Sequence, residues 1–360
     1  MSRARMRMRM GIGIGLGIAA LLSTACERIV LGGQTATLEE GLEIIAVNHP
    51  NAAAVQPGAT LVVEGAALRG LDRTFEEGTA DAPSPGAAIV SDGGTVQILA
   101  GRIMAGTVEI TRSDPSGPPS PVLLPFSLAS ALVARDSTID IRGGSFVSSA
   151  FIGRIPVLLA DAPVVTVSDS SLTLSGGQFL LGDNPGRGGP FPVTPTVLAA
   201  RSRVSILDGD FSAGPVQLFS SQAVIRGGRF DRGLALGFRP PVLGFTPVPG
   251  GLDNVPRTPI VPAPGCTEIR GGSFALVGAL EPGERLFLYG SFSLPPGPLT
   301  PPPGTPQTPG GRVFPDDQIP PIRIDGTLQD GTEAHFDLLL TPGAQAVLDP
   351  GAPDGPGCSS

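Results

Sequence analysis

The stretch Ser137-Thr138-Ile139-Asp140-Ile141-Arg142-Gly143-Gly144-Ser145-Phe146 decides the fold of this chain. Apolar and polar residues alternate up to a glycine pair, and a large apolar residue follows the pair. A period of two places Ile139, Ile141 and Phe146 on one side of a strand and Asp140 and Arg142 on the other. The glycine pair marks a corner, where the chain turns with positive φ or packs backbone against backbone. The sequence therefore predicts a bent strand with an apolar inner side.

The motif recurs eight times at irregular spacing. Its shortest unit, between Phe211 and Phe230, holds only one other apolar strand, Val216-Gln217-Leu218-Phe219, and a turn. A repeat of about 20 residues made of short strands and glycine turns is typical of a parallel β-solenoid, whose coils stack about 4.8 Å apart. We predict an all-β, single-stranded parallel β-helix of about eight coils, three-sided and right-handed because crossovers between parallel strands take that hand.

The residues that close the eight copies are expected to point into the tube. Six of them are phenylalanines, whose rings would form an internal ladder, each ring contributing about 1.5–3 kcal/mol through its burial. In chain order the closing residues are Leu68, Ile103, Phe146, Phe179, Phe211, Phe230, Phe274 and Phe292.

Long units differ from short ones by insertions rich in proline and glycine. They lie between the closing residue of one motif and the strand before the next, so we expect them to enter at one corner. They would then gather along one side of the tube, where a partner would bind. The longest are Asp114–Pro125, Gly182–Pro195 and Arg239–Pro264.

With these copies, residues 59–292 resemble the secreted right-handed β-helix proteins of the pectate-lyase-like superfamily and the Gly-Gly-x-Phe repeat proteins of bacterial surfaces. Hydrolases of that superfamily use grouped Asp residues on adjacent coils with a nearby His. Its lyases combine a carboxylate-bound calcium ion with an Arg or Lys base. The motif itself is specific for architecture and carries little information about function.

The segment before the repeats, residues 26–58, is expected to tether the solenoid and to close its open end. Thr37 and Glu40 fit a capping box, and Leu38, Leu42 and Ile45 share one helical face, so a short helix over 37–47 is predicted. A first strand over Leu42–Val47 is the alternative.

The segments after the repeats are expected to lie outside the solenoid. Residues 293–321 hold eleven prolines and predict a stiff linker. Residues 322–360 predict a hairpin, which turns at Gln329-Asp330-Gly331, and a tail.

Residues 1–25 have the features of an export signal. Four arginines precede the apolar stretch Gly11–Leu22, which is too short to cross a bilayer, and small residues lead up to Cys26. The pattern resembles a bacterial lipoprotein signal, in which that cysteine is acylated and becomes the new N-terminus. We expect an exported chain held to a membrane or cell surface through Cys26, with plain secretion or a periplasmic location as the alternative.

The three cysteines agree with this expectation. A lipidated Cys26 leaves Cys266 and Cys358 to form one disulfide, which suits an oxidising compartment. The alternative is two unpaired thiols.

Charge and composition exclude several functions. The chain has no Lys, so phosphate binding by a P-loop and Schiff-base chemistry are excluded. Without residues 1–25 it carries 20 Arg against 32 acidic residues, a formal charge of −12. This negative field disfavours nucleic acid as a partner, and no nucleotide is expected. With no Trp and one Tyr, there is no evident aromatic platform for sugar stacking.

Few residues suggest chemistry. His49 and His335 lie outside the motif strands and are expected at the surface. Asp208 and Asp210 offer oxygens that a calcium ion would accept, although such a site needs about six to eight ligands. The outward Arg226 and Arg270 are the other candidate substrate contacts, and no catalytic residue is predicted. Solvated charges that keep the solenoid soluble are the competing interpretation.

The sequence therefore favours an exported, lipid-anchored, non-catalytic β-solenoid of the cell envelope or surface, with a binding face formed by its insertions. Glycans or another envelope protein would be its partners. The alternatives are a polysaccharide lyase or hydrolase and a carbohydrate-binding protein without catalysis.

Overall fold

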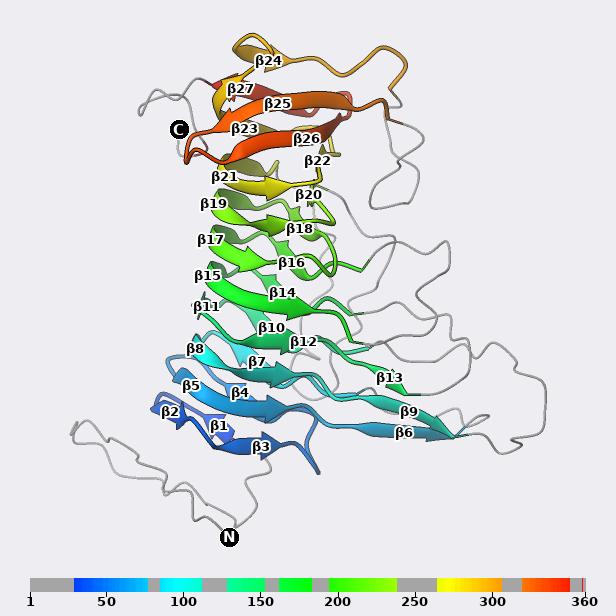
Figure 1. The fold of residues 1–360 in the computed structure, drawn as a ribbon. Helices are drawn as coiled ribbons and strands as arrows, with labels where there is room; N and C mark the ends of the chain where they lie inside the picture. Colours follow the sequence, from blue (N-terminus) through cyan, green and yellow to red (C-terminus); the bar gives the residue numbers. More distant parts are fainter. Residues whose placement is uncertain are drawn as a thin grey trace.

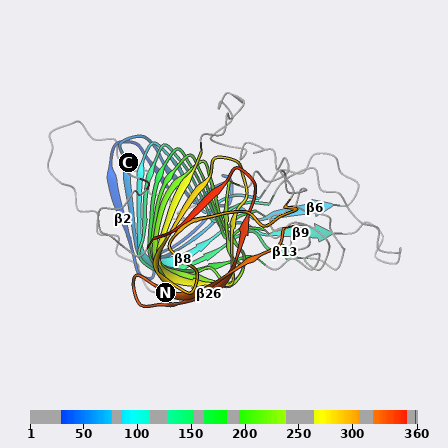
Figure 2. The ribbon, with the colours of Figure 1, turned by 90° about the horizontal axis from the view of Figure 1, so that it is seen from above.

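The chain folds into a column of stacked parallel β-strands, and the predicted parallel β-helix is confirmed. The column rises from the N-terminal to the C-terminal end (Figure 1), and seen along its axis the coils lie over one another (Figure 2). Sheet B faces the viewer in Figure 1 and its strands run from left to right as the chain climbs, which makes the coil right-handed. The computed structural model of the chain describes residues 29–76, 85–111, 128–152, 162–182, 194–237, 264–305, 319–349 and 358.

Sheet A is the side made of the shorter strands. Each strand between its first and last pairs in parallel with the strands one coil below and above, as Val165–Ser168 does with Leu132–Arg135 and Val197–Ala200. In chain order its strands are β1 (Ile29–Leu31), β4 (Ala53–Val55), β7 (Ile89–Asp92), β10 (Leu132–Arg135), β14 (Val165–Ser168), β16 (Val197–Ala200), β18 (Val216–Phe219), β20 (Leu234–Leu236), β22 (Leu276–Ala279) and β26 (Glu333–Leu340).

Sheet B is built from the motif strands. It is bent at the glycines, so that two coils contribute two short strands each, β2 with β3 and β11 with β12, and the other coils contribute one strand each. Its strands are β2 (Thr35–Glu39), β3 (Glu43–Ile45), β5 (Thr60–Arg69), β8 (Thr95–Met104), β11 (Thr138–Ile141), β12 (Ser145–Val147), β15 (Ser171–Leu180), β17 (Arg203–Asp210), β19 (Gln222–Phe230), β21 (Cys266–Phe274), β23 (Arg285–Phe292) and β27 (Gln345–Asp349).

The described residues form ten coils, two more than the motif copies. The extra lower coil is β1 with β2 and β3, and the extra upper coil is β26 with β27, which pair in parallel with β22 and β23. Three further strands of coils two to four form a small parallel sheet that projects from the column: β6 (Arg73–Glu76), β9 (Val108–Thr111) and β13 (Phe151–Ile152) (Figures 1 and 2).

Stacked phenylalanine rings form the core of the upper coils. The ring centroids of Phe146, Phe179, Phe211, Phe230 and Phe274 follow one another at 5.1, 4.9, 4.9 and 4.6 Å. In the lower coils the same register positions hold aliphatic residues, from Ile44 through Leu68 to Ile103, which pairs with Phe146.

The predicted ladder is therefore confirmed, with one correction at its top. Phe292 is only partly buried and lies outside the stack. The ring next to Phe274 is Phe336 of β26, at 5.7 Å and edge-on. Phe292 is displaced because β23 turns after Tyr289 to pair antiparallel with β25, so the next inward aromatic comes from the tail.

The two glycines of each pair are required for different reasons. A Cβ on Gly227 would lie 2.2 Å from the carbonyl oxygen of Leu207 in the coil below, so only glycine permits the coils to approach there. Gly228 has φ +104°, a conformation that residues with a Cβ rarely adopt. Both reasons expected from the sequence hold at this corner.

A row of buried serines lines the corner between sheets A and B, which the sequence did not predict. The N–H groups of Ser137, Ser170 and Ser202 donate to the hydroxyl of the serine one coil higher, at 3.1, 3.2 and 3.1 Å. The last acceptor is Ser221 Oγ. Each hydroxyl also donates to the carbonyl two residues before it, so the polar groups of this buried turn are satisfied.

Residues 37–47 do not form the predicted helix. They contribute to β2 and β3, which turn at Gly41 (φ +83°) and pair with β5. The inward Leu38 and Ile44 are fully buried by this pairing. Burial in the stack therefore outweighs the capping box, and the segment forms strands. The alternative, a first strand over Leu42–Val47, is found in a shorter form as β3, and two strands precede it.

The upper end is closed by strands that the sequence had placed in a linker and a separate hairpin. β24 (Gly297–Leu299) pairs antiparallel with β27, and β25 (Ile322–Leu328) pairs antiparallel with β26 and β23. The turn at Gln329-Asp330-Gly331 is present, but its second strand belongs to the tenth coil. The folded column thus extends past residue 292 on one side and before residue 59 on the other.

The proline-rich insertions lie almost wholly outside the described residues, but their points of attachment are described. Asp114–Pro125 and Gly182–Pro195 fall between a sheet B side and the next sheet A strand, as expected. Arg239–Pro264 falls instead between β20 and β21, at the opposite corner. The sheet A strand β20 begins directly after the turn that follows Phe230. The insertion therefore comes after this strand and not before it.

Candidate functional site

Two arginines come together on the outer side of sheet B near the capped end. Arg226 is in register with Gly271, so Arg226 of β19 and Arg270 of β21 lie on adjacent coils. With Gln329 and Asp330 of the turn between β25 and β26, they line an open hollow of about 350 Å³. The hollow thus lies between the column and its cap.

Arg270 is held in place from three sides. Its guanidinium forms an ion pair with Glu268 at 2.9 Å, donates to Gln329 Oε1 at 3.1 Å and lies 4.2 Å from the ring centre of Tyr289. Because Glu268 is buried and Tyr289 is 1% exposed, the contacts of Arg270 with these two residues are shielded from water. Burial also raises the pKa of the Tyr289 hydroxyl. Arg270 is therefore a fixed wall of the hollow.

Arg226 differs because its side chain is exposed and no ion pair joins it to another described residue. Asp330, opposite, accepts hydrogen bonds from the backbone N–H and hydroxyl of Thr332 at 2.9 and 2.7 Å and so stabilises its own turn. The unpaired guanidinium of Arg226 is the group in the hollow best placed to receive an acidic ligand.

Asp208 and Asp210 do not join this site. Asp208 accepts a hydrogen bond from the N–H of Gly209 at 2.8 Å, and Asp210 accepts one from the N–H of Ser212 at 3.0 Å. Neither lines the hollow, and in the part of the chain that the structure describes no three His, Cys, Asp or Glu side chains are grouped so as to hold a metal ion. Of the four candidate contacts, the fold therefore brings only Arg226 and Arg270 together.

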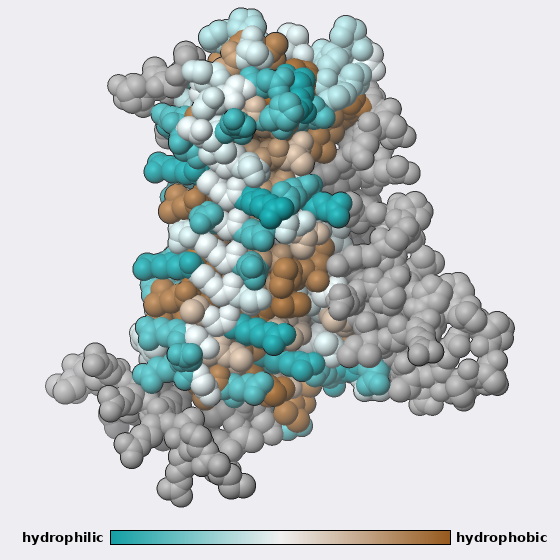
Figure 3. Space-filling model, viewed as in Figure 1, coloured by the Kyte–Doolittle hydropathy of each residue, from teal (hydrophilic) through white to brown (hydrophobic). Residues whose placement is uncertain are grey.

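Several outward charges are paired with one another. Arg135 binds Asp92 of the coil below at 3.0 Å, and Arg201 binds Asp169 at 2.7 Å. Hydrophilic side chains lie in separate clusters across the face seen in Figure 3, between smaller apolar groups. Further pairs are Arg69–Asp72, Arg142–Asp140, Arg229–Asp231 and Arg323–Asp337.

The two histidines lie apart from the hollow. His49 is exposed in the turn between β3 and β4. His335 is 73% exposed on β26, and its Nδ1 is hydrogen-bonded to Asp325 Oδ1 at 2.6 Å. Neither histidine lines the hollow.

Cys266 and Cys358 form a disulfide across the outer side of the capped end. Both pack with Phe287, Tyr289 and Val347, and the N–H of Cys358 donates to Glu268 Oε1 at 2.8 Å. The C-terminal tail therefore fastens the carboxylate that holds Arg270. Cys26, the expected lipidation site, lies outside the described residues.

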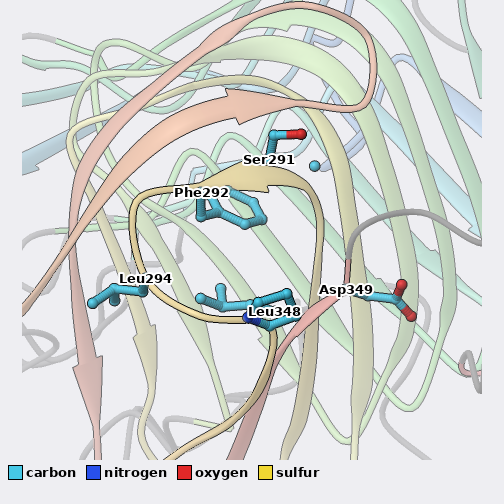
Figure 4. A pocket seen from close by; sticks show the side chains of 7 residues that line it. Ser291, Phe292, Leu294, Leu348 and Asp349 are labelled. Atoms are coloured by element: carbon cyan, nitrogen blue, oxygen red, sulfur yellow. The ribbon is translucent and has the colours of Figure 1, made fainter.

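A second, smaller hollow of about 200 Å³ lies at the top of the column. Figure 4 shows Phe292, Leu294 and Leu348 around it, with Ser291 and Asp349 at its edge. This hollow lies between the end of β23, the segment that leads to β24, and the end of β27. Its lining holds one carboxylate and no cationic side chain.

One buried acid was missed by the sequence reasoning. Glu284 is 4% exposed and accepts a hydrogen bond from the N–H of Gly265 at 3.0 Å. Burial raises the pKa of Glu284 to about 7. It lies where the serine row ends, and nothing in its sequence neighbourhood distinguishes it from a surface glutamate.

Comparisons of the chain with protein-family models, with curated proteins and with solved structures found no match. None of the described residues belongs to a helix long and apolar enough to cross a membrane.

Proposed function

We propose that this chain is an exported, lipid-anchored, non-catalytic β-solenoid of the cell envelope that binds a partner on its outer surface. The observation that carries this proposal is the use of the outward charges. Seven of the thirteen arginines among the described residues form ion pairs within or between coils, and in the hollow beside the cap the exposed Arg226, which forms none of these pairs, lies next to the fixed Arg270. Such an arrangement stabilises a surface and offers a contact, and within the described residues it brings no general acid and base together.

Anchoring is supported by the sequence of the leader and by the disulfide. A Cys266–Cys358 bond is expected in an exported protein, and its formation leaves Cys26 as the single remaining thiol. Labelling cells with palmitate tests the anchor. The wild-type chain should incorporate label and Cys26→Ala should not, whereas equal labelling of both would contradict anchoring through Cys26.

A second candidate, binding of an acidic glycan in the hollow, is favoured by the adjacency of Arg226 and Arg270. Planar guanidinium groups bind carboxylates in a bidentate manner. The β-helix lyase or hydrolase remains the enzymatic alternative to both candidates.

An array of glycans and polysaccharides, probed with residues 26–360, distinguishes these candidates. Acidic-glycan binding that is lost in Arg226→Gln and kept in Arg203→Gln supports the glycan-binding role. Arg203 is the matched control because it is an exposed arginine of the same sheet, on β17. Chain shortening of a bound polysaccharide would contradict the non-catalytic proposal.

A further inference from the structure

The lowest coil of the column has unpaired strand edges. Among the described strands, β1 pairs only with β4, and β2 and β3 pair only with β5. The opposite end is covered by the antiparallel strands β24 and β25. Among the described strands, the lower end therefore exposes the edges of β1, β2 and β3, whereas the outer edge at the upper end belongs to the three-residue β24.

This coil begins three residues after Cys26. A fully extended chain spans at most about 3.6 Å per residue, so Ile29 lies within about 11 Å of the α-carbon of Cys26 in any conformation. If acyl chains hold Cys26 in a bilayer, the first coil is held at the level of the lipid headgroups. No other coil is subject to such a restraint.

The surface of the first coil suits such a position. Ile45 and Val47, at the end of β3, are 38% and 55% exposed, and they are two of the five exposed large apolar residues among those described. Glu39, Glu40 and Glu43 are exposed on the same coil. Apolar and hydrophilic groups lie side by side at the lower end of the column (Figure 3). Two apolar side chains among charged ones favour shallow contact with headgroups over deep insertion.

We propose that the first coil is a membrane-contact surface and that the column stands upright on the bilayer, with its capped end outward. This inference rests on the anchoring through Cys26 proposed above. The unpaired edge and the exposed Ile45 and Val47 meet the headgroups. The Arg226 side of the hollow, six coils higher, is held about 29 Å above the first coil.

Quenching of tryptophan fluorescence by brominated lipids tests this orientation, because the chain has no native Trp. A maleimide-linked diacyl lipid is coupled to Cys26 of residues 26–360, in which the disulfide protects the other two cysteines. Single Trp residues are introduced by Val47→Trp, Leu207→Trp and Gln329→Trp, one on each of the lowest coil, a middle coil and the cap. On zwitterionic vesicles, the Val47→Trp protein should lose fluorescence and the other two should not.

Two outcomes would overturn the proposal. Equal quenching of Val47→Trp and Leu207→Trp would show a column lying on its side, and no quenching of Val47→Trp would show a first coil held away from the lipid. As a control, a Gly/Ser linker of about 20 residues before Ile29, with a mean end-to-end distance of about 25 Å, should abolish the quenching.

The acidic residues of the first coil provide a second, independent reading. With anionic lipid in the vesicles, quenching of Val47→Trp should weaken, and exchange of Glu39, Glu40 and Glu43 for Gln should restore it. Restoration by the same exchange at Glu64, Glu109 and Glu333 would contradict the proposed contact surface. The lipid is attached chemically, so these results do not depend on acylation in the cell, which the palmitate experiment tests separately.

Discussion

The stack of strands ends differently at the two ends of the column. At the lower end the first coil has one edge that no other described strand pairs with, and the inner positions are filled by aliphatic side chains such as Ile44 and Leu68. At the upper end antiparallel strands cover the last coils, an aromatic ladder fills the core and a disulfide fastens the tail. A solenoid needs a cap wherever no surface covers its end. This contrast supports the proposal that the lower end rests on a membrane and the capped end faces solvent.

Truncation of a ring in the ladder should have the largest effect. Phe230→Ala removes a fully buried ring stacked between Phe211 and Phe274, and should lower the free energy of unfolding by about 3–5 kcal/mol. Leu68→Ala, at the same register near the lower end, should cost about 2–5 kcal/mol, and Phe292→Ala less than either. Urea titrations measure all three, and a cost at Phe292 that exceeds the one at Phe230 would contradict the ladder.

Removal of the disulfide should come next and should affect one end. Exchange of both Cys266 and Cys358 for Ser opens a loop between residues 92 apart in sequence, and should cost about 2–4 kcal/mol. Amide hydrogen exchange should accelerate in β21, β23 and β27, which lie beneath the tail, and remain unchanged in β2 and β5. Uniform acceleration along the column would show that the tail does not act locally.

The buried Glu284 should make the stability of the upper end depend on pH. Its pKa, raised by burial from 4.5 to about 7, means that the folded state holds the proton more tightly than the unfolded state. The stabilising contribution is therefore complete below about pH 4.5 and is lost as the pH rises through about 7. Between these limits the wild type should lose about 3 kcal/mol relative to Glu284→Gln.

Unfolding titrations at pH 4.5, 6 and 8 measure this difference. Glu40→Gln, which removes an exposed carboxylate from the first coil, is the control and should follow the wild type. Parallel curves for the wild type and Glu284→Gln would refute the assignment.

The smallest effect on stability is expected at Arg226. Because its side chain is exposed and forms no ion pair with the described residues, Arg226→Ala should change the free energy of unfolding by less than about 0.5 kcal/mol. Arg270→Ala should cost more, since it leaves the buried Glu268 without its cation. Thermal unfolding of both variants measures the difference in stability. Equal losses would contradict the assignment of Arg270 as a structural residue and Arg226 as a ligand contact.

The periodic parts of the fold were predictable from the sequence, and its two ends were not. Alternation and the glycine pair predict that Ile139, Ile141 and Phe146 are buried, because each copy of the motif has the same neighbours above and below. At an end that environment changes, so Phe292 is replaced in the ladder by Phe336, and residues 37–47 form strands in place of a helix. Local sequence patterns such as a capping box carry no information about the coil that packs against the segment.

Of the candidate site, only the two arginines were predictable from the sequence. Alternation places Arg226 and Arg270 on the outer side of adjacent coils, as the register of β19 and β21 shows. That Gln329 and Asp330 would lie across from them depends on the antiparallel return of β25, which no repeat encodes. The serine row was visible as Ser at the start of several motif copies, but its role follows only from the left-handed turn before each serine.

The central claim is that the coils form a single in-register stack. Distances between outward residues at one register position of sheet B test this claim most directly. Thr37, Val62, Ser205 and Val224 occupy the same register position in coils one, two, six and seven. With spin labels on a Cys26→Ser background, the Val62–Ser205 and Thr37–Val224 pairs should lie about 19 and 29 Å apart, at about 4.8 Å per coil. Equal distances for the two pairs, or a shorter one for Thr37–Val224, would contradict the stack.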